Sequence, residues 1–169
     1  VTTRPEYKKI PDWDANITYG YMWYVNDAIE GWAVMLNAPN DFVRDLWHYR
    51  AGIYEGTNFH WDKQGAQQIA ETYQNGKLHG RFEWYEQCLP RQIGQYENDE
   101  RVGIWEYYDS KGSLFMRRNF DRIAQPSEIP SETKDKAIWA ESFQGGKKKT
   151  EGFIVIKQQE NNIEHIHNV

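Results

Sequence analysis

Apolar and polar residues alternate with a period of two along much of this chain. Residues 80–85 place Gly80, Phe82 and Trp84 on one side and Arg81, Glu83 and Tyr85 on the other. This alternation is typical of a β-strand with one packed face and one wet face. Residues 62–65 and 109–112 are rich in Asp and Gly and supply tight turns between such strands. Residues 41–48 suit a short helix or a strand equally.

An aromatic residue recurs at intervals of 23 to 25 residues, which indicates an internal repeat. The six aromatic anchors are Tyr24, Tyr49, Tyr73, Tyr96, Phe120 and Phe143. Two of them are followed by the pairs Asn75-Gly76 and Asn98-Asp99, which suit a tight turn with positive φ. A glycine seven residues after the anchor, as at Gly80 and Gly103, lets another backbone approach closely. The sixth copy has Gly152 nine residues after its anchor, because its turn is longer.

Each repeat therefore predicts two short strands and two turns, and the expected fold class is all-β. One hairpin is only marginally stable in water, but several in a row can bury one another's aromatic faces. We expect one elongated antiparallel sheet of about six stacked β-hairpin units of 23–25 residues, spanning residues 21–157. Residues 1–20 are expected to cap one end, and residues 158–169 to form a C-terminal tail.

Composition and charge narrow the classes of partner. Aromatic residues make up 15% of the chain, yet the mean hydropathy is −0.90, as expected for strands with one wet face. No stretch approaches the ~20 apolar residues of a membrane-spanning helix. The net charge of −5 argues against nucleic acid and anionic membranes as partners, and it suits a basic protein.

Cys88 is the single cysteine, so the chain has no internal disulfide and no zinc cage built from cysteines. A chain without disulfides fits a reducing compartment, and we expect the cytoplasm. The bacterial periplasm or secretion is the alternative, if a signal peptide was removed before Val1.

Residues 95–114 contain a spaced set of aromatic, glycine and leucine residues, namely Tyr96, Gly103, Trp105, Tyr107 or Tyr108, Gly112 and Leu114. This pattern resembles MORN-type repeats, especially the bacterial variant found in a family of toxin–antitoxin antitoxins. Residues 73–85 match nearly as well, and the resemblance covers residues from about 49 to 120. It implies an elongated, gently twisted sheet with mostly non-catalytic roles: scaffolding, partner binding and, in the bacterial variant, neutralisation of a toxin. It implies no active site that could be carried over.

The residues that could carry chemistry are better explained as structural or solvent-exposed. His165 and His167 would need further ligands to hold a metal ion, so we interpret them as part of a polar tail. Glu83 and Glu106 occupy equivalent repeat positions and are expected side by side on the wet face, as a solvated ladder rather than an acid–base pair. Residues 145–149 lack the spacing of a phosphate-binding loop. We therefore predict no catalytic residue, no metal site and no cofactor.

The aromatic residues are the most informative feature for function. Most tryptophans are expected in the core, but a one-layer sheet leaves its second face exposed. The candidate partner-binding residues on that face are Trp61, Glu83, Tyr85, Glu106, Tyr107 and Tyr108. Tyr and Trp beside charged residues are typical of protein-binding surfaces.

We expect a non-catalytic protein-binding repeat module. In its narrower form the hypothesis is an antitoxin or immunity protein that neutralises a partner protein, a basic toxin. One alternative is an envelope-associated structural protein that binds glycan or lipid. Another is a hydrolase on the exposed sheet face, which would need titratable groups that converge in a pocket.

Overall fold

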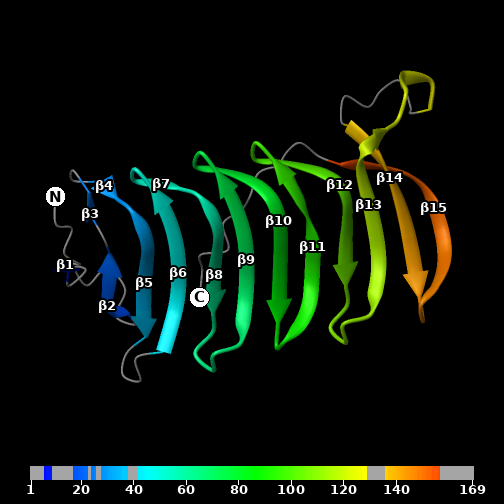
Figure 1. Ribbon diagram of the computed structural model, residues 1–169. Helices are drawn as coiled ribbons and strands as arrows, with labels where there is room; N and C mark the ends of the chain where they lie inside the picture. The colour runs from blue at the N-terminus through cyan, green and yellow to red at the C-terminus, as the bar shows by residue number, and fades with distance from the viewer. Residues whose placement is uncertain are drawn as a thin grey trace.

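The computed structural model describes residues 6–8, 17–22, 24–25, 28–37, 42–128 and 136–156 (Figure 1). Two strands that fall in the predicted N-terminal cap lie at one end of the sheet. The rest of that cap and the predicted tail, with His165 and His167, lie outside the described residues. So does the side chain of the first anchor, Tyr24.

Among the described residues, thirteen strands form one sheet, and its strands follow one another in space in the order of the chain (Figure 1). The strands are β1 (Glu6–Lys8), β2 (Ile17–Met22), β5 (Gly31–Asn37), β6 (Phe42–Arg50), β7 (Ile53–Tyr54), β8 (Gly56–Trp61), β9 (Gln67–Gln74), β10 (Lys77–Glu86), β11 (Leu89–Glu97), β12 (Glu100–Tyr108), β13 (Leu114–Ile123), β14 (Lys136–Gln144) and β15 (Lys147–Ile156). A separate pair joins β3 (Tyr24–Val25) to β4 (Ala28–Ile29), and a 3₁₀ turn, η1, covers Pro126–Glu128.

All pairings within the sheet are antiparallel, so the predicted all-β fold of stacked hairpins in one open sheet is confirmed. Residues 41–48, for which the sequence left helix and strand open, lie almost entirely in β6.

Three turns along one edge of the sheet repeat the same backbone geometry. The φ angles are 50° and 78° at Ala51 and Gly52, 52° and 79° at Asn75 and Gly76, and 52° and 72° at Asn98 and Asp99. Two successive positive φ angles define the two-residue turn that best matches the twist of a hairpin. Each pair stands two and three residues after an anchor tyrosine, so the turn predicted from residues 75–76 and 98–99 is confirmed.

The glycines seven residues after the anchors also share a conformation. Gly31, Gly56, Gly80 and Gly103 have φ angles of 83°, 78°, 114° and 64°. The pairing of β10 with β9 shifts register between Leu78 and Phe82, on either side of Gly80. Gly80 is therefore a bulge residue, and all four glycines have a backbone conformation that L-residues rarely adopt.

The turns predicted at residues 62–65 and 109–112 lie at the opposite edge and are closed by an aspartate. Asp62 Oδ1 accepts hydrogen bonds from the backbone N–H of Gln64 (2.9 Å) and Ala66 (2.8 Å). Asp109 Oδ1 accepts the same pair from Lys111 (2.8 Å) and Ser113 (2.9 Å). An aspartate that binds its own following backbone in this way fixes a local turn.

The sixth anchor, Phe143, departs from the repeat. Its turn at Gly145 and Gly146 lies at the edge opposite to the tyrosine-anchored turns (Figure 1). The reason is the fifth unit, in which β13 runs on to Ile123 without a tight turn. Two regular units would place four strands between the turn at residues 98–99 and the turn at residues 145–146, but only three, β12 to β14, lie there. An odd number of antiparallel strands returns the chain to the other edge. The expectation that Phe143 repeats the other anchors is therefore wrong.

The two faces of the sheet differ in what they bury. One face, here called the core face, carries the cluster Tyr73, Leu78, Tyr96, Trp105, Tyr107, Phe120, Ile138 and Ile156. Trp105 is fully buried, and its Nε1 donates to the backbone oxygen of Gln95 at 3.0 Å. The anchors Tyr73, Tyr96 and Phe120 are 9%, 5% and 4% exposed, so these three mark equivalent core positions.

Neighbouring units are also joined along the edge by carboxylates. Glu30 Oε2 accepts from the N–H of Ala51 at 2.7 Å, and Glu55 Oε2 accepts from the N–H of Asn75 at 2.9 Å. Both glutamates stand directly before a repeat glycine. In both, the N–H group that donates the hydrogen bond belongs to the turn of the following unit. Each such contact satisfies a turn N–H that would otherwise need water.

Candidate functional site

The face opposite to the core face, here called the polar face, carries a row of aligned side chains that crosses the sheet. Directly paired residues in antiparallel strands lie on the same face. The pairings place one row in the order Leu46, Phe59, Ala70, Glu83, Ile93, Glu106, Arg117, Glu141 and Glu151. The row is apolar at its N-terminal end and, apart from Ile93, charged from Glu83 onward. Glu83 and Glu106 share the wet face as expected, but they do not stand side by side, because Ile93 of β11 lies between them.

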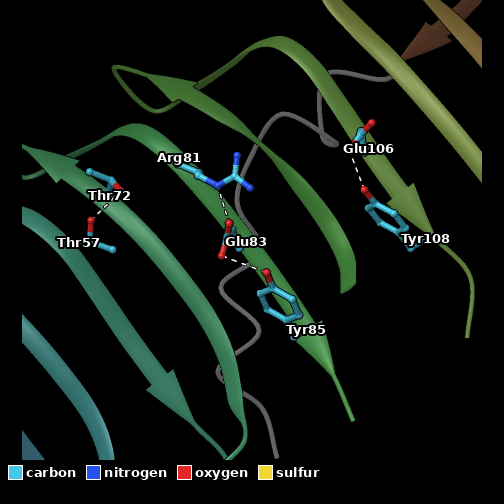
Figure 2. Close-up of polar contacts among 7 residues, drawn as sticks. All are labelled: Thr57, Thr72, Arg81, Glu83, Tyr85, Glu106 and Tyr108. Atoms are coloured by element: carbon cyan, nitrogen blue, oxygen red, sulfur yellow. Dashed lines mark hydrogen bonds and ion pairs between the residues drawn. The ribbon is translucent and has the colours of Figure 1, made fainter. Parts of the chain in front are cut away.

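Glu83 binds an arginine with one oxygen and a tyrosine with the other (Figure 2). Arg81 Nε donates to Glu83 Oε1 at 2.5 Å, and the Tyr85 hydroxyl donates to Glu83 Oε2 at 3.1 Å. All three residues lie on β10, two positions apart, so they share one face. The ion pair restricts the carboxylate, and the carboxylate in turn restricts the tyrosine.

Glu106 on β12 repeats this arrangement. The Tyr108 hydroxyl donates to Glu106 Oε2 at 2.7 Å (Figure 2), while Arg117 Nη2 lies 2.8 Å from Oε1. Here the arginine comes from the neighbouring strand, β13, instead of from the same strand. We call each set an Arg–Glu–Tyr triad, because arginine and tyrosine together occupy both carboxylate oxygens.

The triads shift the pKa values of their members. Burial, followed by the hydrogen bond to Glu106, raises the pKa of Tyr108 to about 12. Burial and the negative charge of Glu83 raise the pKa of Tyr85. Burial alone would raise the pKa of Glu106, but the hydrogen bonds from Tyr108 and Arg117 outweigh it and hold that pKa below its usual value. At neutral pH both tyrosines are therefore neutral donors, and Glu106 is an anionic acceptor.

The apolar part of the polar face adjoins the first triad. Phe59 and Trp61 stack with ring centroids 5.6 Å apart and an interplanar angle of 28°. Next to them, the hydroxyls of Thr57 and Thr72 lie 3.1 Å apart (Figure 2). The face therefore offers aromatic area beside hydrogen-bonding groups.

Five of the six candidate residues lie on the polar face, and four of them form the two Glu–Tyr pairs. Trp61 lies on the same face toward the N-terminal end. Tyr107 does not belong there, and its selection as an exposed candidate is corrected. It is 9% exposed in the core cluster, since consecutive strand residues point to opposite faces and Tyr107 shares the face of Trp105.

A hollow of about 210 Å³ on the polar face was not anticipated from the sequence. Ile104, Asn119 and Trp139 are paired in a row across β12, β13 and β14. The short Asn119 side chain stands between two large ones, which leaves a depression. The side chains of Arg117 and Arg122 also line it, and the guanidinium carbon of Arg122 lies 3.5 Å from the centroid of the Trp139 ring. Arg118 borders the hollow too, but its side chain lies over Tyr107 on the core face.

A second unanticipated feature is an Asp–His pair on the core face. His60 Nδ1 hydrogen-bonds to Oδ1 of Asp45, whose residue is 3% exposed, and Arg44 Nε lies 3.3 Å from the other carboxylate oxygen. The partners are 15 residues apart on β6 and β8, and they become neighbours only through the pairing of these strands. No pattern within either strand indicated the pair.

No family model and no curated protein matches this chain. The resemblance to MORN-type repeats therefore stays a prediction from the residues quoted for it.

Two further findings concern the part of the chain that the structure describes. Within it, no three or more His, Cys, Asp or Glu side chains come together as a metal ion would require. Over the same residues, no helix combines the length and the apolar character needed to span a bilayer.

Proposed function

We propose that this chain is a non-catalytic repeat module that binds another protein through its polar face. The observation that carries the proposal is the pair of Arg–Glu–Tyr triads. Each holds a tyrosine ring by a hydrogen bond on the surface of the sheet. An aromatic side chain that is already ordered costs less entropy when a partner immobilises it.

Exposed apolar area on the same face supports the proposal. Ile104 is 57% exposed and Trp32 is 42% exposed, and both lie on the polar face. Apolar and aromatic groups surrounded by satisfied polar groups are typical of the centre and rim of an interface. The enzymatic alternative needs converging acids and bases, whereas the hollow on this face brings together the side chains of two arginines and one glutamate.

The charges along the row bear on the partner. The carboxylates of Glu83, Glu106 and Glu141 each contact a cation of the same sheet, so the field of this face is weak at short range. The attraction for a basic partner comes from the net charge of −5 of the whole chain. The narrower proposal, an antitoxin or immunity protein acting on a basic toxin in the cytoplasm, rests on that charge, on the single cysteine and on the resemblance.

The test is co-expression with the protein encoded beside it, followed by size-exclusion chromatography and calorimetry. We expect a complex that the double variant Tyr85→Ala/Tyr108→Ala weakens by about 2 kcal/mol or more, as for aromatic hot spots. Glu100→Ala, at the exposed first residue of β12, serves as the matched control and should leave the affinity unchanged. Thermal melts check that all variants are folded.

Two results would count against the proposal. One is the absence of any complex with the co-expressed protein, together with no rescue of its toxicity. The other is a complex that the double variant binds as tightly as the unchanged chain. Binding to glycan arrays or liposomes with loss of affinity in the double variant would instead favour the envelope-associated alternative.

A further inference from the structure

The hollow around Asn119 has a shape that can receive a side chain. Its volume is about 210 Å³, and it opens on the polar face between β12 and β14. Ile104 stands on one side of Asn119 and Trp139 on the other, since the three residues are paired across the strands. Ile104 is 57% exposed, so the hollow has an apolar wall that water covers when no partner is bound.

Arg122 is held at the rim of this hollow by aromatic rings instead of by a carboxylate. Its guanidinium carbon lies 3.5 Å from the centroid of the Trp139 ring and 5.7 Å from that of Phe153. Among the described residues, no carboxylate forms an ion pair with Arg122. Stacking restricts the planar guanidinium but leaves its N–H edge able to bind a planar anion at two points.

Two arginine side chains and one glutamate side chain, those of Arg117, Arg122 and Glu141, reach the hollow from the polar face. Arg118 also borders the hollow, but its side chain lies over the Tyr107 ring on the core face. The glutamate, Glu141, is held by Lys148 at 3.0 Å, and Arg117 is held by Glu106. Arg122 forms no ion pair with a described residue and interacts with Glu151 only through its charge, so its N–H groups can still bind an anion directly.

We propose that this hollow is the seat for an acidic side chain of a protein partner, whose carboxylate binds Arg122 while an adjacent apolar residue contacts Ile104. A carboxylate matches the two-point geometry of a guanidinium. The apolar wall favours an anion carried on a hydrocarbon side chain over a fully hydrated inorganic ion. This inference rests on the proposed function because it assumes that the occupant is a protein. It adds that this protein presents Asp or Glu beside an apolar residue.

The experiment uses two short capped peptides that differ only in charge, one with alternating Leu and Glu and one with Leu and Gln. Each is titrated into the full chain while NMR follows the arginine Nε–H and tryptophan indole signals. We expect saturable shifts of the Arg122 and Trp139 signals with the Glu peptide alone. Arg122→Gln should weaken its binding about tenfold or more, the value of a charged hydrogen bond.

The matched control is Arg50→Gln, the same substitution at a side chain that is 71% exposed, which should not change the affinity. The inference is overturned if the Gln peptide shifts the same signals equally, or if inorganic phosphate at the same concentration does so. It is also overturned if Arg122→Gln binds the Glu peptide normally, or if no shift occurs. Because the peptides replace the partner, a failure here is distinguishable from a failure of the co-expression test.

Discussion

The indole of Trp105 on β12 lies directly against the backbone of Gly94 on β11. A Cβ atom at position 94 would overlap the Trp105 ring at Cδ2 and Cε2. Because Trp105 is fully buried and hydrogen-bonded through Nε1, it has no room to withdraw. The tryptophan of this repeat therefore requires a glycine on the preceding strand.

Gly94→Ala is expected to lower the free energy of unfolding by about 1–3 kcal/mol, the usual cost of overpacking a core. Gly152→Ala on β15 is the matched control, since a Cβ there meets nothing within 4 Å. It should change the stability by less than about 0.5 kcal/mol. Urea denaturation followed by tryptophan fluorescence measures both, and equal midpoints for the two variants would contradict the packing argument.

Two repeat glycines should differ in their tolerance of alanine, although both stand seven residues after an anchor. Gly80 has a φ of 114°, and a Cβ there would lie 3.2 Å from Thr72. Gly103 has a φ of 64°, within the left-handed region, and open space around it. We expect Gly103→Ala to cost about 1 kcal/mol and Gly80→Ala to cost roughly 2–3 kcal/mol. Chemical denaturation ranks the two variants, and the reverse order would show that the bulge at Gly80 relaxes.

The Glu106 triad should stabilise the fold in a pH-dependent way. The pKa of Glu106 in the folded chain is below the ordinary value of 4.5. The stabilisation by the ionised carboxylate is therefore fully present above pH 4.5 and is lost as the pH falls through the pKa of the folded chain. Glu106→Gln should therefore be less stable than the unchanged chain at pH 7, and the difference should shrink in acid. Urea midpoints between about pH 3 and pH 7 give the comparison, with Glu100→Gln as the control for loss of one charge. A difference that stays constant with pH would remove the ion pair as its cause.

Tyr108 should ionise late in an alkaline titration. Its pKa is raised to about 12, so the stabilisation that accompanies the protonated hydroxyl is present below the ordinary value of 10 and is lost as the pH rises through about 12. In Glu106→Gln the pKa should fall but remain above 10, because burial is the larger cause. Tyrosine ring NMR signals follow the titration. Tyr85, whose carboxylate partner is Glu83, serves as an internal reference that the substitution should leave unchanged.

The features that could be predicted from the sequence are local ones. The Asn-Gly and Asn-Asp turns form because these residues tolerate positive φ wherever they stand in the sheet. The turns at Asp62 and Asp109 form because an aspartate binds the backbone that follows it. Strand alternation likewise assigned Glu83 and Glu106 to one face. The turns depend on a few consecutive residues, and the shared face depends on the repeat spacing.

The features that the sequence did not predict depend on which strands meet. Glu-x-Tyr occurs at residues 71–73, 83–85 and 106–108, and in all three the hydroxyl donates to the glutamate. Yet the first pair includes the buried Tyr73 of the core face, whereas the other two pairs lie on the polar face. The same three-residue pattern therefore does not tell which face of the sheet it occupies. The hollow near Arg122 needs Ile104 and Trp139 to be placed on either side of Asn119, which requires the pairing of three strands. The displaced turn after Phe143 follows from the long connection after Ile123.

The edge contacts of Glu30 and Glu55 make the array of repeats directional. Each carboxylate belongs to one unit and holds a turn N–H of the next. If the later unit is lost, the carboxylate of the earlier unit returns to water at little cost. If the earlier unit is lost, the turn of the later unit loses the carboxylate that accepts its N–H. For the units joined in this way, shortening from the C-terminal side should be tolerated better than shortening from the N-terminal side, and new copies are most easily gained after an existing one.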